Sequence, residues 1–202
     1  MVKRYDRAYF DRWYRGEQRI TSDDDVRWKV AMAVTVAEYF LRRSLRNMLD
    51  VGCGETPWRT HLKSLRPRAS YRGIDPSPYV AKKFRVRQAS FGDLQSLRIK
   101  ERFDLVVCAD VLHYLDEAEI RRGLRALVPL ARGVVFFEVL TSEDDIVGDV
   151  EDMIRRPAKW YRDLFTAAGL TAAAPYIWLA PGLRDDAAAM EVSPTSSPTS
   201  AD

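Results

Sequence analysis

The sequence predicts an α/β fold, with a doubly wound, mostly parallel sheet of six to seven strands and helices on both of its faces. Two observations lead to this expectation. Short apolar segments alternate with helical ones from residue 47 onward. The apolar segments are also nearly continuous in apolar character, as parallel strands covered on both faces are. The length of 202 residues suits one domain with a sizeable core.

The N-terminal part, up to about residue 45, is expected to be helical. Its apolar side chains recur at helical spacing, at Val26, Val30, Val34, Ala37, Leu41 and Leu45. Ser22 is placed to cap this helix, and the three aspartates at 23–25 lie at its positive dipole end. We therefore interpret this acidic run as helix-start chemistry and not as a metal site. Arg42 and Arg43 are expected in the last turn.

The later elements follow in alternation. Strands are expected at 47–51, 71–75, 86–88, 103–109, 133–140 and 174–179, with one more short strand at 187–192. Helices are expected at 57–65, at 78–84, from Asp116 onward and at 157–168. The chain is thereby divided into a helical cap or lid at 1–45, a ligand-binding domain at 46–192 and a tail at 193–202. The tail is rich in Ser, Thr and Pro and is expected to be disordered.

The composition excludes several classes of partner. The net charge is +3, from 32 basic and 29 acidic residues, so a nucleic-acid partner is not expected. No uncharged apolar run approaches the roughly 18 residues that a membrane helix needs, and no apolar run follows the basic start. A cytoplasmic location is therefore expected. Cys53 and Cys108 fit no metal-binding spacing and are expected to be reduced thiols.

The segment LDVGCGETPW, at 49–58, predicts a strand, a tight glycine turn and a helix start. Gly52 and Gly54 would let the backbone bend sharply and touch a ligand. A dinucleotide site wants a third glycine where this chain has Pro57, which lacks an N–H for a pyrophosphate. Thr56 is expected to cap the helix with its own side chain. These features favour a ligand without phosphates.

Asp75 ends the second expected strand, 23 residues after Gly52. A carboxylate at this place can accept hydrogen bonds from both ribose hydroxyls of an adenosine. The simpler interpretation is a turn aspartate before Pro76. We favour ribose binding because the strand, the distance and the turn agree.

Four segments in order, LDVGCGETPW, YRGIDPSPY, FGDLQSL and FDLVVCADVLHYLD, resemble the successive motifs of class I S-adenosylmethionine-dependent methyltransferases. The resemblance covers residues 45–140 and implies a Rossmann-like sheet and S-adenosylmethionine as the cofactor. The domain at 46–192 would then be the methyltransferase domain. A metal site is not implied. The family's seventh strand is faint here, which leaves the C-terminal edge of the sheet open.

The resemblance also implies residue roles. The loop around the methionine part of the cofactor would contain Asp50, Gly52, Cys53 and Gly54. Asp75 would hold the ribose, with Pro76 beside the adenine. Asp93 would accept a hydrogen bond from the adenine amino group, with Leu94 packed on the ring. Ala109 and Asp110 would lie near the methionine ammonium group.

His113 is the candidate general base, because it follows Asp110 by three residues on the ligand face. The interpretation that we favour is a histidine that packs against the cofactor or caps the following loop. His61 is expected on the surface. Asp110 does not begin an Asn/Asp-Pro-Pro-aromatic motif, so methylation of DNA base amines is disfavoured.

Two segments are candidates for the acceptor site. Tyr9, Trp13 and Tyr14 would either form a lid over the cofactor or pack as the core of a helix. The acidic segment at 142–153 would attract a cationic acceptor, although a solvated loop is the simpler interpretation.

The sequence thus predicts methyl transfer from S-adenosylmethionine to a small-molecule acceptor. The alternatives are an RNA methyltransferase with the same cofactor, a nicotinamide-dependent oxidoreductase, and a non-catalytic module that binds the cofactor. The acceptor, the methylated atom and the oligomeric state stay open.

Overall fold

The computed structural model describes residues 5–15, 21–146 and 148–193. One sheet has the order β3-β2-β1-β4-β5-β7-β6, and the strands from β3 to β5 in this order are parallel. β7 runs antiparallel to both of its neighbours. The strands are Asn47–Val51, Ser70–Asp75, Arg87–Gln88, Phe103–Ala109, Ala131–Glu138, Thr171–Ala174 and Ile177–Leu179, from β1 to β7. The predicted fold class is confirmed.

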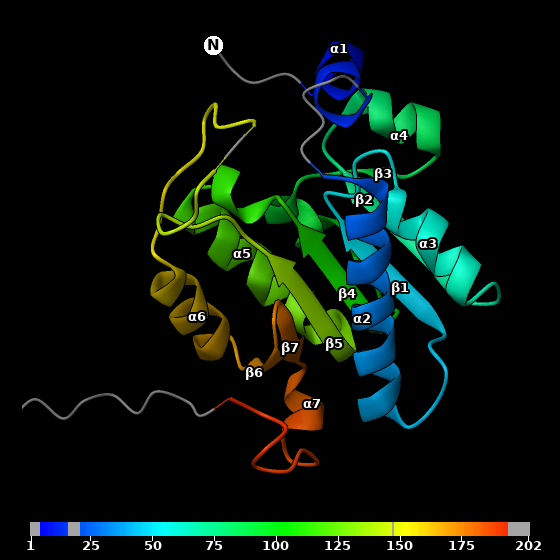
Figure 1. Cartoon of the computed structure of the whole chain (residues 1–202), viewed down its shortest axis with the longest axis vertical. Helices are drawn as coiled ribbons and strands as arrows, with labels where there is room; N and C mark the ends of the chain where they lie inside the picture. The colour runs from blue at the N-terminus through cyan, green and yellow to red at the C-terminus, as the bar shows by residue number, and fades with distance from the viewer. Residues whose placement is uncertain (1–4, 16–20, 147, 194–202) are drawn as a thin grey trace, which may run out of the picture.

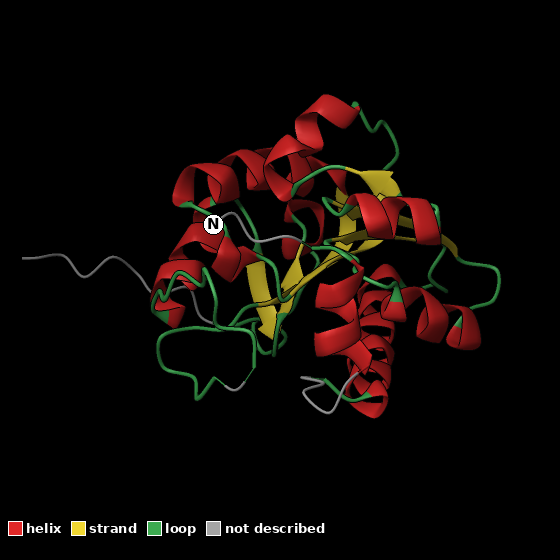
Figure 2. Cartoon of the chain, turned by 90° about the horizontal axis from the view of Figure 1, so that it is seen from above, coloured by secondary structure: helices red, strands yellow, loops and turns green. Residues whose placement is uncertain are grey.

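Helices cover both faces of this sheet (Figures 1 and 2). The α-helices are Arg7–Phe10, Asp23–Leu41, Pro57–Leu65, Pro78–Phe84, Glu117–Leu127, Ala158–Ala167 and Pro181–Arg184, from α1 to α7. A π-helical turn, Asp11–Arg15, and short 3₁₀ turns, Phe91–Leu97, Leu112–Tyr114 and Val128–Leu130, complete them. α5 and α6 share one apolar core with the sheet, and α2, α3 and α7 share the other. Among the described residues, no helix is long and apolar enough to cross a bilayer.

The long helix α2 starts as its sequence predicts. The Ser22 hydroxyl accepts from the Asp25 N–H at 3.0 Å, and the Asp25 carboxylate accepts from the Ser22 N–H at 3.2 Å. This capping box accounts for the acidic run at the helix start. The predicted end is wrong, however. The helix stops at Leu41 because Arg42 adopts a left-handed conformation (φ 52°), so Arg42 and Arg43 lie beyond the last turn.

The C-terminal edge differs from the expectation. The predicted strand at 174–179 is a hairpin of β6 and β7 that turns through Tyr176 (φ 61°). The predicted strand at 187–192 is wrong. The Ala188 N–H donates to the Glu191 carboxylate at 2.8 Å, and the Glu191 N–H donates to the Ala188 carbonyl at 2.9 Å. This local turn uses backbone groups that a strand would need. Apart from Ser193, the tail lies outside the described residues.

The carboxyl ends of β1, β2 and β4 meet at one edge of the sheet. β1 pairs with β2 on one side and with β4 on the other, so the strand order reverses direction there. A parallel sheet has its natural ligand crevice at such a switch point. The loops after β1 and β4, and the end of β2, lie at this crevice.

Candidate functional site

The glycine turn after β1 needs glycine at both of its positions. Gly52 (φ +75°) and Gly54 (φ +49°) have left-handed backbones. A Cβ at Gly52 would lie 2.2 Å from Val111 Cγ2, and one at Gly54 would lie 2.8 Å from the Tyr14 hydroxyl oxygen. The N–H groups of Gly52 and Cys53 donate to the Ile74 carbonyl at 2.7 and 3.1 Å. Hydrogen bonds therefore hold the turn on β2, and the side chains of Val111 and Tyr14 lie directly against its two glycines.

The Asp75 carboxylate links the loop after β1 to the loop after β2. It accepts from the Gly54 N–H at 2.9 Å and from the Ser77 N–H at 2.8 Å, and its side chain is buried. Burial raises the pKa of Asp75, and these two hydrogen bonds oppose that rise. The bond to Ser77 is what a turn aspartate makes, and the bond to Gly54 places the same carboxylate beside the glycine turn.

The expected cap of α3 is wrong. Thr56 occupies the position before the helix, but its side chain makes no capping hydrogen bond there. Its backbone is left-handed (φ 61°, ψ 40°), whereas a capping side chain needs an extended backbone. The prediction of a ligand without phosphates therefore depends on Pro57 alone. This residue begins α3 and has no N–H to donate to a phosphate.

A cavity of about 110 Å³ lies beside Asp75. Its floor and walls include Asp75, Pro76, Ser90, Phe91, Val111 and Leu115. Of the three residues expected at the adenine, Pro76 lines it, and Asp93 and Leu94 do not. Asp93 is exposed and accepts from the Ser90 hydroxyl at 2.7 Å, and Leu94 is buried in the core. The FGDLQSL segment thus reaches the cavity through Phe91.

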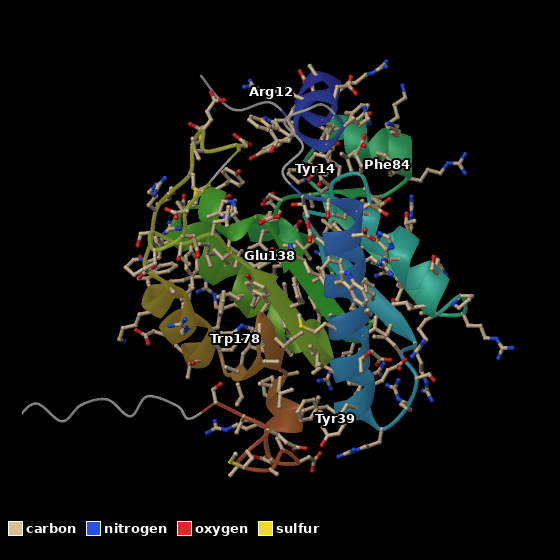
Figure 3. All side chains as sticks on the ribbon, viewed as in Figure 1. Arg12, Tyr14, Tyr39, Phe84, Glu138 and Trp178 are labelled. Atoms are coloured by element: carbon tan, nitrogen blue, oxygen red, sulfur yellow. The ribbon has the colours of Figure 1, made fainter. Side chains whose placement is uncertain are left out.

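A second cavity of about 160 Å³ adjoins the first one. Both are lined by Tyr9, Tyr14, Gly52, Asp110 and Tyr114. The second cavity also contacts Asp50, Cys53, Ala109 and His113, together with Lys29, Trp58, Glu138 and Asp149. The structure therefore brings most of the predicted site residues to one place. Figure 3 shows Tyr14 beneath α1 and Glu138 at the end of β5.

Asp110 lies where the two cavities meet. Its backbone is left-handed (φ 57°), and its N–H donates to the Glu138 carbonyl at 3.0 Å. Its side chain opens into the cavity. Desolvation by the surrounding protein and the nearby Glu138 charge raise the pKa of Asp110 to about 7, and the Lys29 ammonium opposes them. Lys29 itself forms an ion pair with Glu138.

The other residues of the first loop are more enclosed. Asp50 is buried and accepts from the Tyr71 hydroxyl at 2.7 Å. Burial raises the pKa of Asp50 to about 7, and the Tyr71 hydrogen bond opposes it. Cys53 and Cys108 are buried free thiols, and burial raises the pKa of each. Neither thiol is activated as a nucleophile.

His113 is 1% exposed and faces the second cavity. Its Nδ1 accepts from the Leu140 N–H at 3.3 Å, and its carbonyl accepts from the Ile154 N–H at 2.8 Å. A neutral ring with this bond carries its proton on Nε2. The histidine therefore ties together the chain after β5. The expectation for His61 is wrong, since it is 8% exposed and its Nε2 lies 3.1 Å from Asp23 Oδ1.

The N-terminal turns roof the second cavity. The Tyr9 hydroxyl donates to the Asp149 carboxylate at 2.8 Å, and the Tyr114 hydroxyl donates to the Asp149 carbonyl at 2.8 Å. Trp13 and Tyr14 line the cavity beside them. Asp149 is buried, whereas the other acidic residues of 142–153 are exposed. The acidic segment thus sends one carboxylate into the site.

Two charged lining residues, Lys29 and Glu138, escaped the sequence analysis, and Asp149 was predicted only as part of the acidic segment at 142–153. Glu138 had a readable signal, because it is a charged residue at the carboxyl end of a buried strand. Lys29 and Asp149 carry no such signal, since their partners come from distant parts of the chain. Within 5–15, 21–146 and 148–193, no group of three or more His, Cys, Asp or Glu side chains is placed to hold a metal ion.

Comparison with known proteins gave one match to a domain family and several matches to solved structures with a similar fold. A family model of a methyltransferase domain matches residues 49–133. A search of proteins with curated functions found no match. An amino pentose methyltransferase from Micromonospora echinaspora, solved with SAM bound, has a TM-score of 0.63 at 18% identity and covers 89% of this chain and 99% of its own. A sugar N-methyltransferase from Streptoalloteichus has a TM-score of 0.62 at 18% identity, with 89% and 93% covered.

An O-methyltransferase family protein from Burkholderia thailandensis has a TM-score of 0.54 at 20% identity. The match covers 78% of this chain but only 56% of that protein, so this chain spans little more than half of its length. At these identities the likeness to all three structures is one of fold.

Proposed function

We propose that this chain is a class I S-adenosylmethionine-dependent methyltransferase that transfers the methyl group to a small-molecule acceptor. The match of residues 49–133 to a methyltransferase domain supports the enzyme class and the cofactor. The proposal also concerns the acceptor and the residues that serve it.

The residues at the crevice fit this cofactor. S-adenosylmethionine, when bound, supplies a methyl group that its positively charged sulfur has already activated. In the proposed site map, Asp75 holds the ribose and the cavity of Pro76 and Phe91 receives the adenine. Asp50 places negative charge where the methionine ammonium is expected, and Asp110 lies where the two cavities meet. Pro57 offers no N–H to a pyrophosphate, which speaks against a nicotinamide dinucleotide.

The charge of the second cavity is the observation that carries the proposal. Four carboxylates line it: Asp50, Asp110, Glu138 and Asp149. Lys29 is the only Lys or Arg among its described lining residues, and it is paired with Glu138. Such a lining repels a phosphate backbone and suits a small, neutral or cationic molecule. The roof of Tyr9, Trp13 and Tyr14 also limits the acceptor's size.

Proton removal, where the acceptor requires it, is proposed for Asp110. Its carboxylate opens into the cavity, and its raised pKa of about 7 suits a base near neutrality. His113 is the weaker candidate, because its acceptor nitrogen Nδ1 is already bonded to Leu140. We therefore propose that His113 positions the chain after β5.

The acceptor is tested by release of S-adenosylhomocysteine (SAH) in the presence of S-adenosylmethionine. The panel contains small amines, small alcohols and phenols, and a single-stranded RNA oligonucleotide. We expect turnover with small molecules and none with RNA. Turnover on RNA alone contradicts the proposal. Tight SAH binding without turnover on any acceptor would instead favour the non-catalytic module. The cytoplasmic location stays a prediction from the sequence.

A further inference from the structure

A groove runs along the outer edge of the sheet, away from the carboxyl ends of β1 and β4. β3 pairs with β2 at only two positions, Ile74 with Arg87 and Asp75 with Gln88. Among the residues that the structure describes, no strand therefore lies beside residues 70–72 of β2 on that edge. A cavity of about 650 Å³ follows this open edge, and α3 borders it. An open strand edge is a ready template for another strand.

The backbone of this edge is open at Tyr71, whereas Gly73 lies beside residues 86 and 87. The Ser70 N–H donates to the Arg46 carbonyl, and the Ile74 carbonyl accepts from Gly52, so both residues face β1. Backbone groups alternate sides along a strand, so Tyr71 and Gly73 point toward the groove.

The groove is strongly basic. Five of its lining residues are cationic: Arg59, Lys63, Arg72, Arg85 and Arg87. No carboxylate lines it within the described part of the chain, and of the five only Arg72 has an ion pair there, with Glu101. Residues 57–103 contain twelve Lys and Arg against three Asp and Glu, a net charge of +9 in a chain of +3. The positive charge of the molecule is thus concentrated around this edge.

The two sides of the groove differ. Arg59 and Lys63 stand on α3, the helix that shares a core with one face of the sheet. Leu97 and Ile99 pack against the core of the opposite face. A strand added to β2 would direct alternate side chains to these two sides. The side near α3 would meet Arg59 and Lys63, and the opposite side would meet Arg72 together with Leu97 and Ile99.

We propose that this groove binds an extended acidic peptide segment of a partner protein, which adds as a strand to β2. Main-chain hydrogen bonds to Tyr71 hold the segment, and its carboxylates meet Arg59 and Lys63 near α3 and Arg72 on the opposite side. A single-stranded nucleic acid fits less well. Tyr71 is the only aromatic residue in the described lining, and the Arg59 guanidinium already lies 5.7 Å from its ring centre. Stacking platforms for bases are therefore missing.

The test uses a blocked octapeptide of alternating Glu and Val with the full chain at low ionic strength. Amide NMR spectra should show a shift at Tyr71, and fluorescence anisotropy should give the affinity. Arg87→Glu and Lys63→Glu should each weaken binding about fivefold or more, as the loss of a charge pair does. Arg125→Glu, at an exposed position of α5, is the matched control and should change nothing. Thermal unfolding checks that all three variants fold.

Two altered peptides separate the contributions. A peptide with Gln in place of Glu should bind several-fold more weakly, and one with alternate N-methylated amides should lose binding. The proposal is overturned if the Glu peptide does not bind, if both altered peptides bind equally well, or if Tyr71 does not shift. Tighter binding of a single-stranded RNA oligonucleotide at the same amide also overturns it.

Discussion

The Asp75 carboxylate has two roles, since it holds the glycine turn and is the proposed ribose ligand. Its two backbone hydrogen bonds, to Gly54 and Ser77, fix its orientation before any ligand arrives. A side chain fixed in this way loses little entropy on binding.

Asp75→Asn keeps the size of the side chain and removes its charge. We expect the Kd for SAH to rise about 10- to 100-fold, because hydrogen bonds to a charged group are the strong ones. Calorimetry measures this change. Asp186→Asn, at an exposed site, is the control and should leave the Kd unaltered. An unchanged Kd in Asp75→Asn would remove this residue from the site map.

Asp110 is expected to set the pH dependence of turnover for an acceptor that must lose a proton. Its pKa is raised to about 7. A base works only when deprotonated, so kcat/KM should rise with pH through about 7 and then level off. Asp110→Asn should lower kcat/KM at least about 100-fold and abolish this rise. His113→Gln should keep it. A rise that survives in Asp110→Asn and vanishes in His113→Gln would reverse these assignments.

Among the larger elements, the N-terminal turns close the site through one hydrogen bond. The Tyr9 hydroxyl links α1 to Asp149 across the second cavity. Tyr9→Phe should make SAH dissociate about 3- to 10-fold faster, because one buried hydrogen bond is lost. Stopped-flow measurements give this rate. Tyr39→Phe is the matched control, since its hydroxyl bonds to Glu191 away from the cavities. Equal dissociation rates in all three proteins would exclude the proposed roof.

Helices and strands were predicted correctly where residues next to one another in sequence determine them. Ser22 and Asp25 marked the start of α2, and the apolar segments marked β1, β4 and β5. The hairpin of β6 and β7 was read as one strand, although Pro175, directly before Tyr176, marks a break within the segment. Pairing with β5 determines that hairpin, and such pairing is not written locally.

The same limit applies to the site. The glycine turn and Asp75 carry their signals in sequence, and the structure brings them together. His61 was expected on the surface because its partner, Asp23, lies 38 residues earlier in the chain. Asp149 was hidden among exposed acidic residues, and only the fold shows that it alone turns inward. Contacts between residues that lie far apart in the chain could not be predicted from the sequence.

For the molecule as a whole, Asp104 is a central point of stability. This fully buried carboxylate accepts from Arg43 at 2.6 and 2.7 Å, from Arg132 at 2.7 and 3.0 Å, and from the Arg46 N–H at 2.8 Å. It joins the chain after α2 to β1, β4 and β5. Burial opposes its charge, but these hydrogen bonds outweigh it and hold the pKa of Asp104 below its usual value.

Asp104→Asn should lower the free energy of unfolding by about 1.5–3 kcal/mol at neutral pH, as the loss of hydrogen bonds to a charged group does. A lowered pKa stabilises the fold above the unfolded value of about 3.9, and this contribution is lost as pH falls through the native pKa. The difference from the wild type should therefore shrink in acid. Urea titrations at two pH values measure it, with Asp163→Asn, an exposed partner of Lys159, as control. A loss no larger than in this control would contradict the assignment.

Calorimetric titration of the chain with SAH and, separately, with NAD⁺ tests the central claim most directly. If the crevice at β1, β2 and β4 holds an adenosine without a pyrophosphate, SAH releases heat and saturates one site, and NAD⁺ does not. Binding of NAD⁺ with no heat from SAH would contradict the account.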